Sequence, residues 1–426
     1  MMQSIKNVRH RISIGGSRIL GMGLFVGCAA LAGTHAATAA DAPKGPQISR
    51  SIAKEVSDGQ KALQANQFAE GLKHLQAAEA VSGLTAYDHK SIDDLKAFAY
   101  VKLNNLKAAQ ESYEAAIETG AANSEETTRF TKAIFSIAYS SQQYPKAIEY
   151  GKKLVDANAA NGDTYQIVTQ SYYLQKDCKN AVAWADKSIS YARKEGETPK
   201  ENLYLFKLQC AFDASDTPAT IAALEDLIRL TGKTDYWNKL LRFELQDEKV
   251  DANILMIYRV MYNTQAMNAG SDYMEMAQLL GDAALPGEAQ TVLEKALASG
   301  LLTTSEQKDR ATRLLNATKQ RADADRKGLP QLQTEAGKNA AGELDVKLGE
   351  VYYGFGDYQN AVTAINAGLQ KGSVKHLDEA YVYLGLSEQA LKDTADSRKA
   401  FASLKTVPNI SQRVLKLWTL YAEKEG

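Results

Sequence analysis

The chain has 426 residues, of which 45% are hydrophobic and 24% are charged, with 50 Lys and Arg against 51 Asp and Glu. This is the composition of an ordinary folded protein, and it excludes a disordered or fibrous chain. Only 8 prolines occur, whereas Ala, Leu, Lys, Glu and Gln are abundant, so the composition favours helices throughout.

The first 40 residues have the organisation of an export signal. An apolar run without charges covers 19–33, and at about 15 residues it is short for a membrane span, which needs about 20. Small residues at 37–39 (Ala-Thr-Ala) fit a cleavage site, and those at 38–40 (Thr-Ala-Ala) fit nearly as well. Basic residues precede the run: Lys6, Arg9, Arg11 and Arg18. The pattern predicts a signal peptide over 1–40, a disordered segment over 41–49 and a periplasmic protein.

Two alternatives for this segment remain open. The apolar run could be retained as an N-terminal anchor helix, which its length disfavours. The sequence Phe-Val-Gly-Cys ending at Cys28 loosely resembles a bacterial lipobox, so lipidation at Cys28 is a minor alternative. Cleavage after residue 40 leaves no transmembrane segment in the mature chain.

Removal of the signal changes the charge and the cysteine count. Four basic residues and no acidic residue are lost, which leaves 46 basic against 51 acidic residues. A mildly acidic protein has no electrostatic reason to bind nucleic acid or an anionic membrane. Cys178 and Cys210 remain. An even number in an oxidising compartment suggests one disulfide, with two separate buried thiols as the alternative.

Internal similarity organises the rest of the chain. The clearest unit reads LDVKLGEVYYGFGDYQNAVTAINAGLQKG. Leu348 and Tyr352 lie one turn apart on one helix face, and Gly356 supplies a turn to a second helix. Gly349 and Ala361 are small where two antiparallel helices would press together. Neither helix can bury its apolar face alone, so each needs its neighbours.

The position of Ala361 recurs along the chain, mostly as a small residue. In chain order its equivalents are Gly71, Ala109, Ala147, Ala181, Thr220, Asn253, Ala289 and Ser397. They predict eight or nine antiparallel helix pairs, over 50–81, 88–119, 125–158, 162–195, 200–231, 235–266, 271–299, 341–371 and 377–405. A terminal helix over 411–424 is expected to cap the array.

One segment departs from the repeat. Residues 305–327 are highly charged and predict a helix, whereas 328–341 are rich in Gly, Pro, Ala and Gln and predict a connection. This connection is either a hinge between two stacks or a decorated loop within one. The predicted organisation is therefore an N-terminal array over 50–302, a charged helix and linker over 303–340, and C-terminal repeats with the capping helix over 341–426.

The order L-G-x-x-Y, G-x-Y and Ala in the clearest unit resembles the tetratricopeptide-repeat (TPR) signature. The resemblance implies an all-α, right-handed TPR superhelix that binds other proteins.

Longer segments, among them DYWNKLLRFELQD and IYRVMYNTQAM, look like the large periplasmic TPR proteins of Gram-negative bacteria that are often encoded beside a TonB/ExbB/ExbD system. That narrower resemblance implies an accessory of energised transport across the outer membrane, with TonB, ExbB and ExbD as expected partners. The alternative is a TPR factor of envelope assembly or polysaccharide secretion.

Residues for catalysis are not clustered in the sequence. Outside the signal only His74, His89 and His376 occur, far apart, and no H-E-x-x-H, C-x-x-C, G-x-S-x-G or Walker motif is present. We therefore expect no catalytic residue, no metal and no cofactor, and a scaffold is favoured over an enzyme.

The better functional candidate is the groove that the first helices of TPR pairs line. Tyr139, Tyr173 and Tyr353 fall at equivalent positions near the end of a first helix, and Gln170 and Glu350 lie about one turn earlier. Tyrosines offer a large contact area with a hydrogen-bonding tip. The alternative is that these are ordinary packing tyrosines, since the chain holds 21.

The two cysteines fall in consecutive repeats. Cys178 begins a second helix, and Cys210 lies late in the next first helix. Stacking of consecutive repeats would bring the two together, so we expect a disulfide between them that contributes about 2–4 kcal/mol.

Overall fold

The computed structural model describes residues 46–246 and 248–425, which contain helices and no strand. The predicted signal peptide over 1–40 and the lipidation site Cys28 lie outside these residues. No helix of the described chain is both long enough and apolar enough to span a bilayer. The chain divides between Pro199 and Lys200 into two compact units, which are described separately. The predicted organisation, with an N-terminal array over 50–302, a charged helix and linker over 303–340 and C-terminal repeats over 341–426, stays a prediction.

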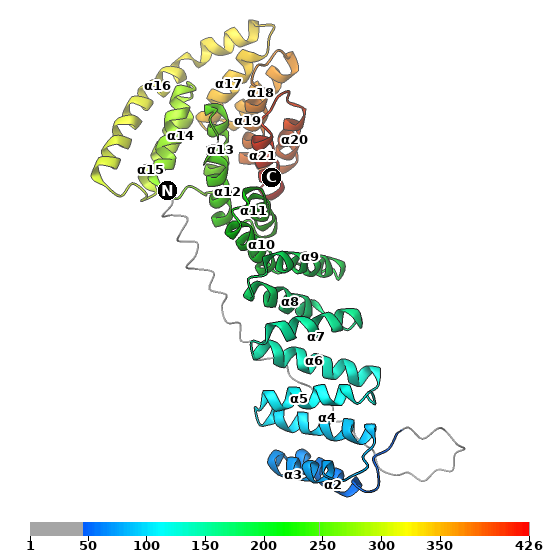
Figure 1. The fold of residues 1–426 in the computed structure, drawn as a ribbon. Helices are drawn as coiled ribbons and strands as arrows, with labels where there is room; N and C mark the ends of the chain where they lie inside the picture. The colour runs from blue at the N-terminus through cyan, green and yellow to red at the C-terminus, as the bar shows by residue number, and fades with distance from the viewer. Residues whose placement is uncertain (1–45, 247, 426) are drawn as a thin grey trace. The chain divides into compact units, whose positions relative to one another are not determined.

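The first unit consists of four antiparallel helix pairs, which follow one another in chain order (Figure 1). The pairs are α2 (Ala53–Gln64) with α3 (Phe68–Glu79), α4 (Ala86–Lys102) with α5 (Leu106–Glu118), α6 (Ser124–Ser140) with α7 (Tyr144–Asp156), and α8 (Gly162–Leu174) with α9 (Cys178–Lys194).

The second unit contains five further pairs, one long single helix and a terminal helix. The pairs are α10 (Glu201–Asp213) with α11 (Thr217–Thr231), α12 (Thr234–Gln246) with α13 (Asp251–Asn263), α14 (Gly270–Asp282) with α15 (Pro286–Ala298), α17 (Glu343–Gly354) with α18 (Tyr358–Lys371), and α19 (Leu377–Ala390) with α20 (Thr394–Ser403). The long helix α16 spans Ser305–Lys338, η2 is a 3₁₀ turn over Leu404–Thr406, and α21 spans Gln412–Glu425. The prediction of an all-α chain of helix pairs with a terminal capping helix is confirmed.

The small residues of the repeat mark one position in each pair. The fourth residue of the second helix is buried in eight of the nine described pairs, as Gly71, Ala109, Ala147, Ala181, Thr220, Ala289, Ala361 and Ser397. A Cβ added to Gly349 on the facing helix of one pair would lie 2.4 Å from Ile365 Cγ1, so small size is required there. The prediction that Asn253 is the equivalent residue in α13 is wrong by one position. Ile254 is the fourth residue of that helix, and Asn253 is only half-buried.

A common turn joins the two helices of a pair. The residue two positions before the second helix has a φ between 55° and 75° in eight pairs, at Asn66, Asn104, Gln142, Lys176, Ser215, Ala284, Gly356 and Lys392. In five of these pairs the next residue caps the second helix by accepting a hydrogen bond from the third helical N–H, as Asn105, Asp177, Asp216, Asp357 and Asp393 do. The same turn therefore sets the same geometry within these eight pairs.

The expected connection over 328–341 is mostly helical, which corrects the prediction. Helix α16 continues through Gly328 and Pro330 to Lys338 (Figure 1, the long yellow helix). Its second half is anchored by apolar packing, because Leu329, Leu332 and Ala336 cluster with Leu344, Leu348, Tyr352 and Ala364 of α17 and α18. This burial outweighs the helix-breaking tendency of Gly and Pro. Its first half packs on α15.

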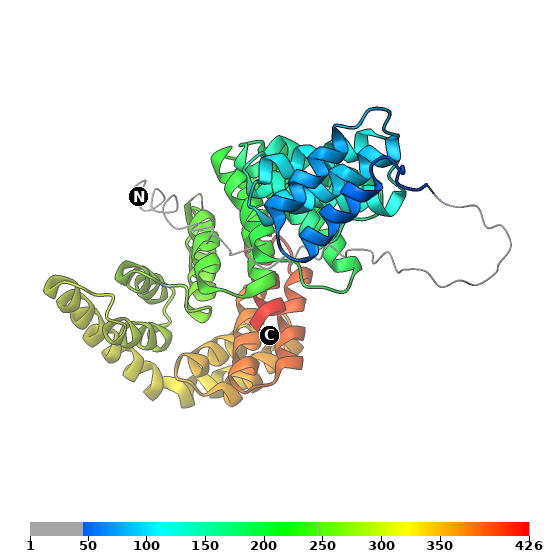
Figure 2. The same ribbon diagram turned by 90° about the horizontal axis from the view of Figure 1, so that it is seen from below.

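The terminal helix α21 connects the last pair of the second unit to the first two pairs of the same unit. It packs on α20, α11 and α13, and Figure 2 shows the helices of this unit from below. Trp418 is fully buried and stacks on Phe401 with ring centroids 5.4 Å apart. Arg413 pairs with Glu244 at 2.8 Å. Helix α21 is therefore a cap that also closes the unit.

The N-terminal segment is partly ordered, which corrects the prediction of disorder over 41–49 for its last residues. Ile48 packs against the core of the first pair. Ser49 donates two hydrogen bonds to Asp88, from its backbone N–H at 2.8 Å and from its hydroxyl at 2.6 Å. A buried carboxylate needs such donors, so Asp88 fixes the start of the described chain.

Candidate protein-binding face

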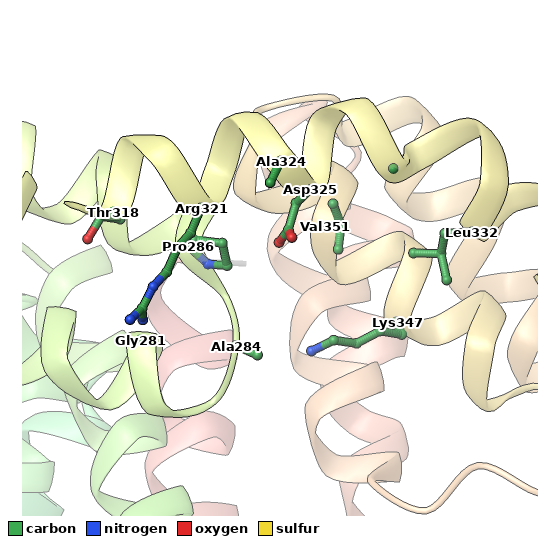
Figure 3. Close-up of a pocket in the computed structure, with 11 residues that line it drawn as sticks. Gly281, Ala284, Pro286, Thr318, Arg321, Ala324, Asp325, Leu332, Lys347 and Val351 are labelled. Carbon is green, nitrogen blue, oxygen red and sulfur yellow. The ribbon is translucent and has the colours of Figure 1, made fainter. Parts of the chain in front are cut away.

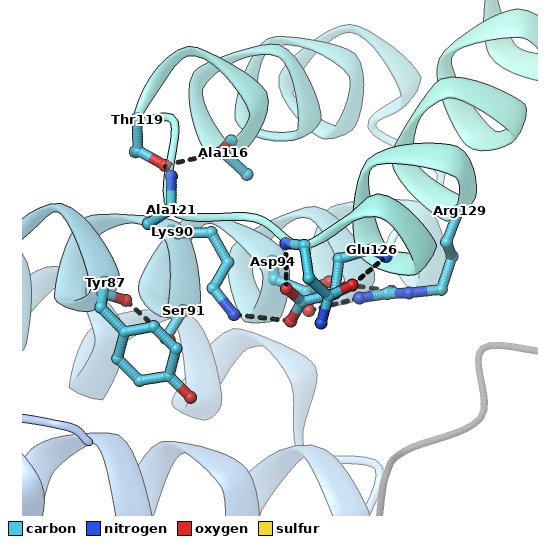
Figure 4. Close-up of polar contacts among 10 residues, drawn as sticks. Tyr87, Lys90, Ser91, Asp94, Ala116, Thr119, Ala121, Glu126 and Arg129 are labelled. Carbon is cyan, nitrogen blue, oxygen red and sulfur yellow. Dashed lines mark hydrogen bonds and ion pairs between the residues drawn. The ribbon is translucent and has the colours of Figure 1, made fainter. Parts of the chain in front are cut away.

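The first helices α2, α4, α6 and α8 form what we call the first-helix face of the first unit. Two ion pairs join α4 directly to α6 (Figure 4). Arg129 donates to both carboxylate oxygens of Asp94, at 3.0 and 2.6 Å, and Lys90 donates to Glu126 at 2.6 Å. The Lys90 ammonium also lies 4.4 Å from the centre of the Tyr87 ring.

These two ion pairs depend on how α4 and α6 pack together. Lys90 is only 4% exposed. Burial alone would raise the pKa of Glu126, but the hydrogen bonds from Lys90 and from the backbone of Asn123 outweigh it, and the pKa lies below its ordinary value. Bidentate pairing of Arg with a carboxylate fixes orientation as well as charge. The paired charges of α4 and α6 therefore cancel on this face, and the ion pairs fix the distance between the two helices.

Three of the predicted groove residues lie on this face. Tyr139 belongs to α6, and Gln170 and Tyr173 belong to α8 of the next pair; all three are half-buried. Lys132, Ser136 and Tyr139 follow the i, i+4, i+7 spacing that places side chains on one side of a helix. The arrangement offers aromatic contact area and hydrogen-bonding groups.

The other two predicted groove residues belong to the second unit. Glu350 on α17 is 6% exposed and pairs with Lys347 at 3.1 Å. Burial raises the pKa of Glu350, and Lys347 only partly opposes this. The Tyr353 ring packs on Tyr358 at 5.7 Å and on Tyr383 at 5.0 Å.

The tyrosines share a packing contact within their pairs. Tyr139 packs on Tyr144 with an angle of 59° between the rings, and Tyr353 packs on Tyr358 at the same angle. In both pairs the partner is the first residue of the second helix. Each of these tyrosines therefore contributes to packing within its own helix pair. The role of all five predicted groove residues in binding a protein stays a prediction.

A buried polar cluster lies inside the second unit. Arg259 on α13 is fully buried and donates to Glu288 on α15 at 3.2 and 3.1 Å. Tyr383 on α19 donates to the same carboxylate at 2.7 Å and accepts a hydrogen bond from Arg259. Burial would lower the pKa of Arg259, but the charge of Glu288 more than offsets it and the pKa is raised. The cluster ties three helices together.

A cavity of about 550 Å³ lies beside the middle of α16 (Figure 3). Its walls come from α16, α17 and the turn between α14 and α15. The charged side chains that line it are Arg321, Asp325 and Lys347. Sequence reasoning missed this cavity, because it exists only if α16 is one continuous helix. The available signal was the spacing of Leu329 and Leu332.

The structure places the cysteines where the sequence expected them. Cys178 is the first residue of α9 and is half-buried, and Cys210 lies in α10 and is 4% exposed. Their pairing stays a prediction. Among the residues that the structure describes, no group of three or more His, Cys, Asp or Glu side chains is placed to hold a metal ion.

Comparison with known proteins adds likenesses of fold. No protein-family model matches the chain, and no curated protein matches it. Similar solved structures include the TPR2AB-domain:pHSP90 complex of yeast Sti1, with 17% identity over 63% of this chain and 98% of that chain and a TM-score of 0.34.

A second similar structure is Naa15/Naa10 bound to HypK-THB, with 11% identity over 85% of this chain and 60% of that chain and a TM-score of 0.41. A third is the C-terminal part of a TPR repeat-containing protein from Cytophaga hutchinsonii, with 14% identity over 61% of this chain and 93% of that chain and a TM-score of 0.31. At these low scores the fold assignment rests on the helix pairs themselves.

Proposed function

We propose that this protein is a non-catalytic scaffold that binds other proteins through the first-helix face of its first unit. The observation that supports this most is the placement of Tyr139, Gln170 and Tyr173 on successive first helices of that face. Half-buried aromatic residues on a rigid support lose little conformational entropy on binding, which is why tyrosine is frequent at binding hot spots. The balanced pairs Asp94–Arg129 and Lys90–Glu126 supply that support.

We further propose that the scaffold acts in the periplasm as an accessory of TonB-dependent transport across the outer membrane. The signal-like residues 1–40 support export. The resemblance of the quoted segments to periplasmic TPR proteins supports TonB, ExbB and ExbD as partners.

Site-specific photo-cross-linking in living cells tests both proposals. A photoreactive residue replaces Tyr139 or Gln170 on the first-helix face. The control replaces Glu149, which is exposed on the second helix α7. We expect the first two positions to capture a defined partner that the Glu149 position does not capture. Mass spectrometry then identifies it.

The outcomes separate the two levels of the proposal. Capture of TonB, ExbB, ExbD or an outer-membrane receptor supports the transport role. Specific capture of cell-wall or polymer-export proteins keeps the scaffold but replaces transport by envelope assembly. Equal capture at Tyr139 and Glu149 would contradict the use of this face.

A further inference from the structure

The cavity beside α16 has the size of a small-molecule site. Its volume of about 550 Å³ lies in the range of about 300–1,000 Å³ that ligand pockets occupy. Helix α16 packs on α15 with its first half and on α17 with its second half, so the cavity lies where one helix bridges two helix pairs.

The walls of the cavity are mainly apolar. They include Ala284, Pro286, Ala324, Leu332 and Val351 (Figure 3). Two glycines, Gly281 and Gly328, also line the cavity, and a Cβ added to either would meet nothing within 4 Å. Such walls can accommodate an aliphatic or aromatic body.

Two opposite charges line the cavity. Arg321 and Asp325 lie one turn apart on α16 and line the cavity, and Figure 3 shows both side chains extending from that helix toward it. Opposite charges four residues apart commonly pair on a helix. Here neither residue forms an ion pair or a hydrogen bond with any residue in the described part of the chain.

The third charge of the cavity is already balanced. The Lys347 ammonium lies 3.1 Å from the buried carboxylate of Glu350. The charged groups that have no partner among the described residues are therefore the exposed Arg321 guanidinium and the half-buried Asp325 carboxylate. Burial raises the pKa of Asp325, and Lys347 only partly opposes this. An added positive charge beside Asp325 would stabilise its ionised form.

We propose that this cavity binds a small zwitterion with an apolar body, whose ammonium group contacts Asp325 and whose carboxylate contacts Arg321. Apolar amino acids and short apolar peptides with free termini share this chemistry. The residues of this site are separate from those of the first-helix face. A test of ligand binding in the cavity is therefore independent of a test of protein binding by the first unit.

Isothermal titration of the exported full-length protein with leucyl-leucine and with L-leucine tests the proposal. We expect at least one to bind, and the tighter of the two identifies the source of the zwitterion. For leucyl-leucine, N-acetylation removes the ammonium group and C-terminal amidation removes the carboxylate. Each should weaken binding about tenfold, the effect of losing one charge-assisted hydrogen bond.

Matched variants assign each charge to its residue. Asp325→Asn should weaken binding of the free dipeptide about tenfold and leave binding of the N-acetylated form unchanged. Arg321→Gln should weaken binding of the free dipeptide about tenfold and leave binding of the C-terminally amidated form unchanged. Asp323→Asn is the control, because Asp323 is exposed on the same helix and does not line the cavity.

A blocking variant separates binding from folding. Gly328→Phe should fill the cavity and abolish binding while the melting temperature stays the same or rises, because the added side chain meets open space and Gly disfavours helix. Three results would overturn the proposal: no binding of either zwitterion, equal affinity for the free and the doubly capped dipeptide, or unchanged affinity in Gly328→Phe.

Discussion

Arg259 carries a fully buried guanidinium whose charge is balanced by one carboxylate, Glu288. Removing one partner of a buried ion pair leaves an uncompensated charge, so Glu288→Gln should lower the free energy of unfolding by about 3–5 kcal/mol. Urea unfolding followed by circular dichroism measures the loss. The Arg259 guanidinium also lies 4.5 Å from the centre of the Tyr383 ring. The ring carries no negative charge, so it does not replace the carboxylate of Glu288.

The control for this prediction is an exposed ion pair. Lys319 and Glu294 are each 46% exposed at the side chain, so Glu294→Gln should change stability by less than about 1 kcal/mol. Replacing both Arg259 and Glu288 by Met should recover much of the loss of Glu288→Gln, because no charge stays buried. Equal losses in Glu288→Gln and Glu294→Gln would contradict the cluster's role.

Asp88 links pH to the stability of the first pairs. It accepts four hydrogen bonds from Ser49 and Thr85. Burial would raise its pKa, but these bonds outweigh it and lower the pKa to about 2. The folded pKa is thus depressed, and the stabilisation, about 2 kcal/mol, is present above about pH 4 and is lost as the pH falls toward 2.

Asp88→Asn should therefore destabilise the protein at pH 7 and flatten its acid unfolding between about pH 4 and pH 2. Acid titration followed by circular dichroism compares it with the wild type and with Glu125→Gln, which changes an exposed carboxyl group. Parallel titration curves for the wild type and Asp88→Asn would show that Asp88 does not contribute.

Sequence alone predicts single residues only where the constraint is local. The small residues at the position of Ala361 repeat along the chain, so they could be found without a structure. Arg259 and Tyr383 are 124 residues apart, and in one dimension each looks like an ordinary helix residue. Only the fold shows that they share Glu288.

At the scale of the helix pair, close approach of the two helices is the feature to test. Ala361 is fully buried, and its carbonyl would lie 3.0 Å from a Cβ added to Gly349. Ala361→Phe should overpack the pair and cost about 1–3 kcal/mol. Gln359→Phe, on the exposed side of the same helix, is the control. Equal melting temperatures for the two variants would mean that the register is wrong.

Helix α16 shows the limit of element prediction from local composition. Gly328 and Pro330 favour a break, and the predicted connection followed from them. The apolar spacing of Leu329, Leu332 and Ala336 favours a helix, but it outweighs the break only because α17 and α18 cover it. That cover comes from residues further along the chain, so tertiary packing decides the element.

At the scale of the whole molecule, α21 should control the stability of the second unit. Trp418 is fully buried, and Trp418→Ala should cost about 3–5 kcal/mol. In hydrogen exchange, the amides of α11, α13 and α20 should lose protection, because these helices pack on α21. The amides of α2 to α5 serve as the internal control. Unchanged protection in α11 and α13 would contradict closure of the unit.

The predicted disulfide is also tested on the whole chain. Labelling of the exported protein without reduction should find neither Cys178 nor Cys210 reactive, and labelling after reduction under denaturing conditions should find both. Two reactive thiols in the non-reduced, denatured protein would contradict the disulfide.

The order and number of helix pairs could be predicted, because each pair repeats a local pattern and contacts its neighbours. The contacts of α21 with α11 and α13 could not, because a terminal helix with one apolar side predicts a cap and does not name distant partners. The same holds for the predicted groove: equivalent positions placed Tyr139 and Tyr353 alike, yet they belong to different units.

Closure by α21 also bears on how the two units can change over evolution and how they fold. In the described part of the first unit, the main contacts of each helix pair are with the pairs beside it, so a duplicated pair could be inserted without breaking a distant contact of this kind. In the second unit an inserted pair would separate Arg229 from Glu423, which form an ion pair 194 residues apart. Such long-range contacts slow folding. We therefore expect related chains to vary in the number of pairs before Pro199 and to keep it constant after Lys200.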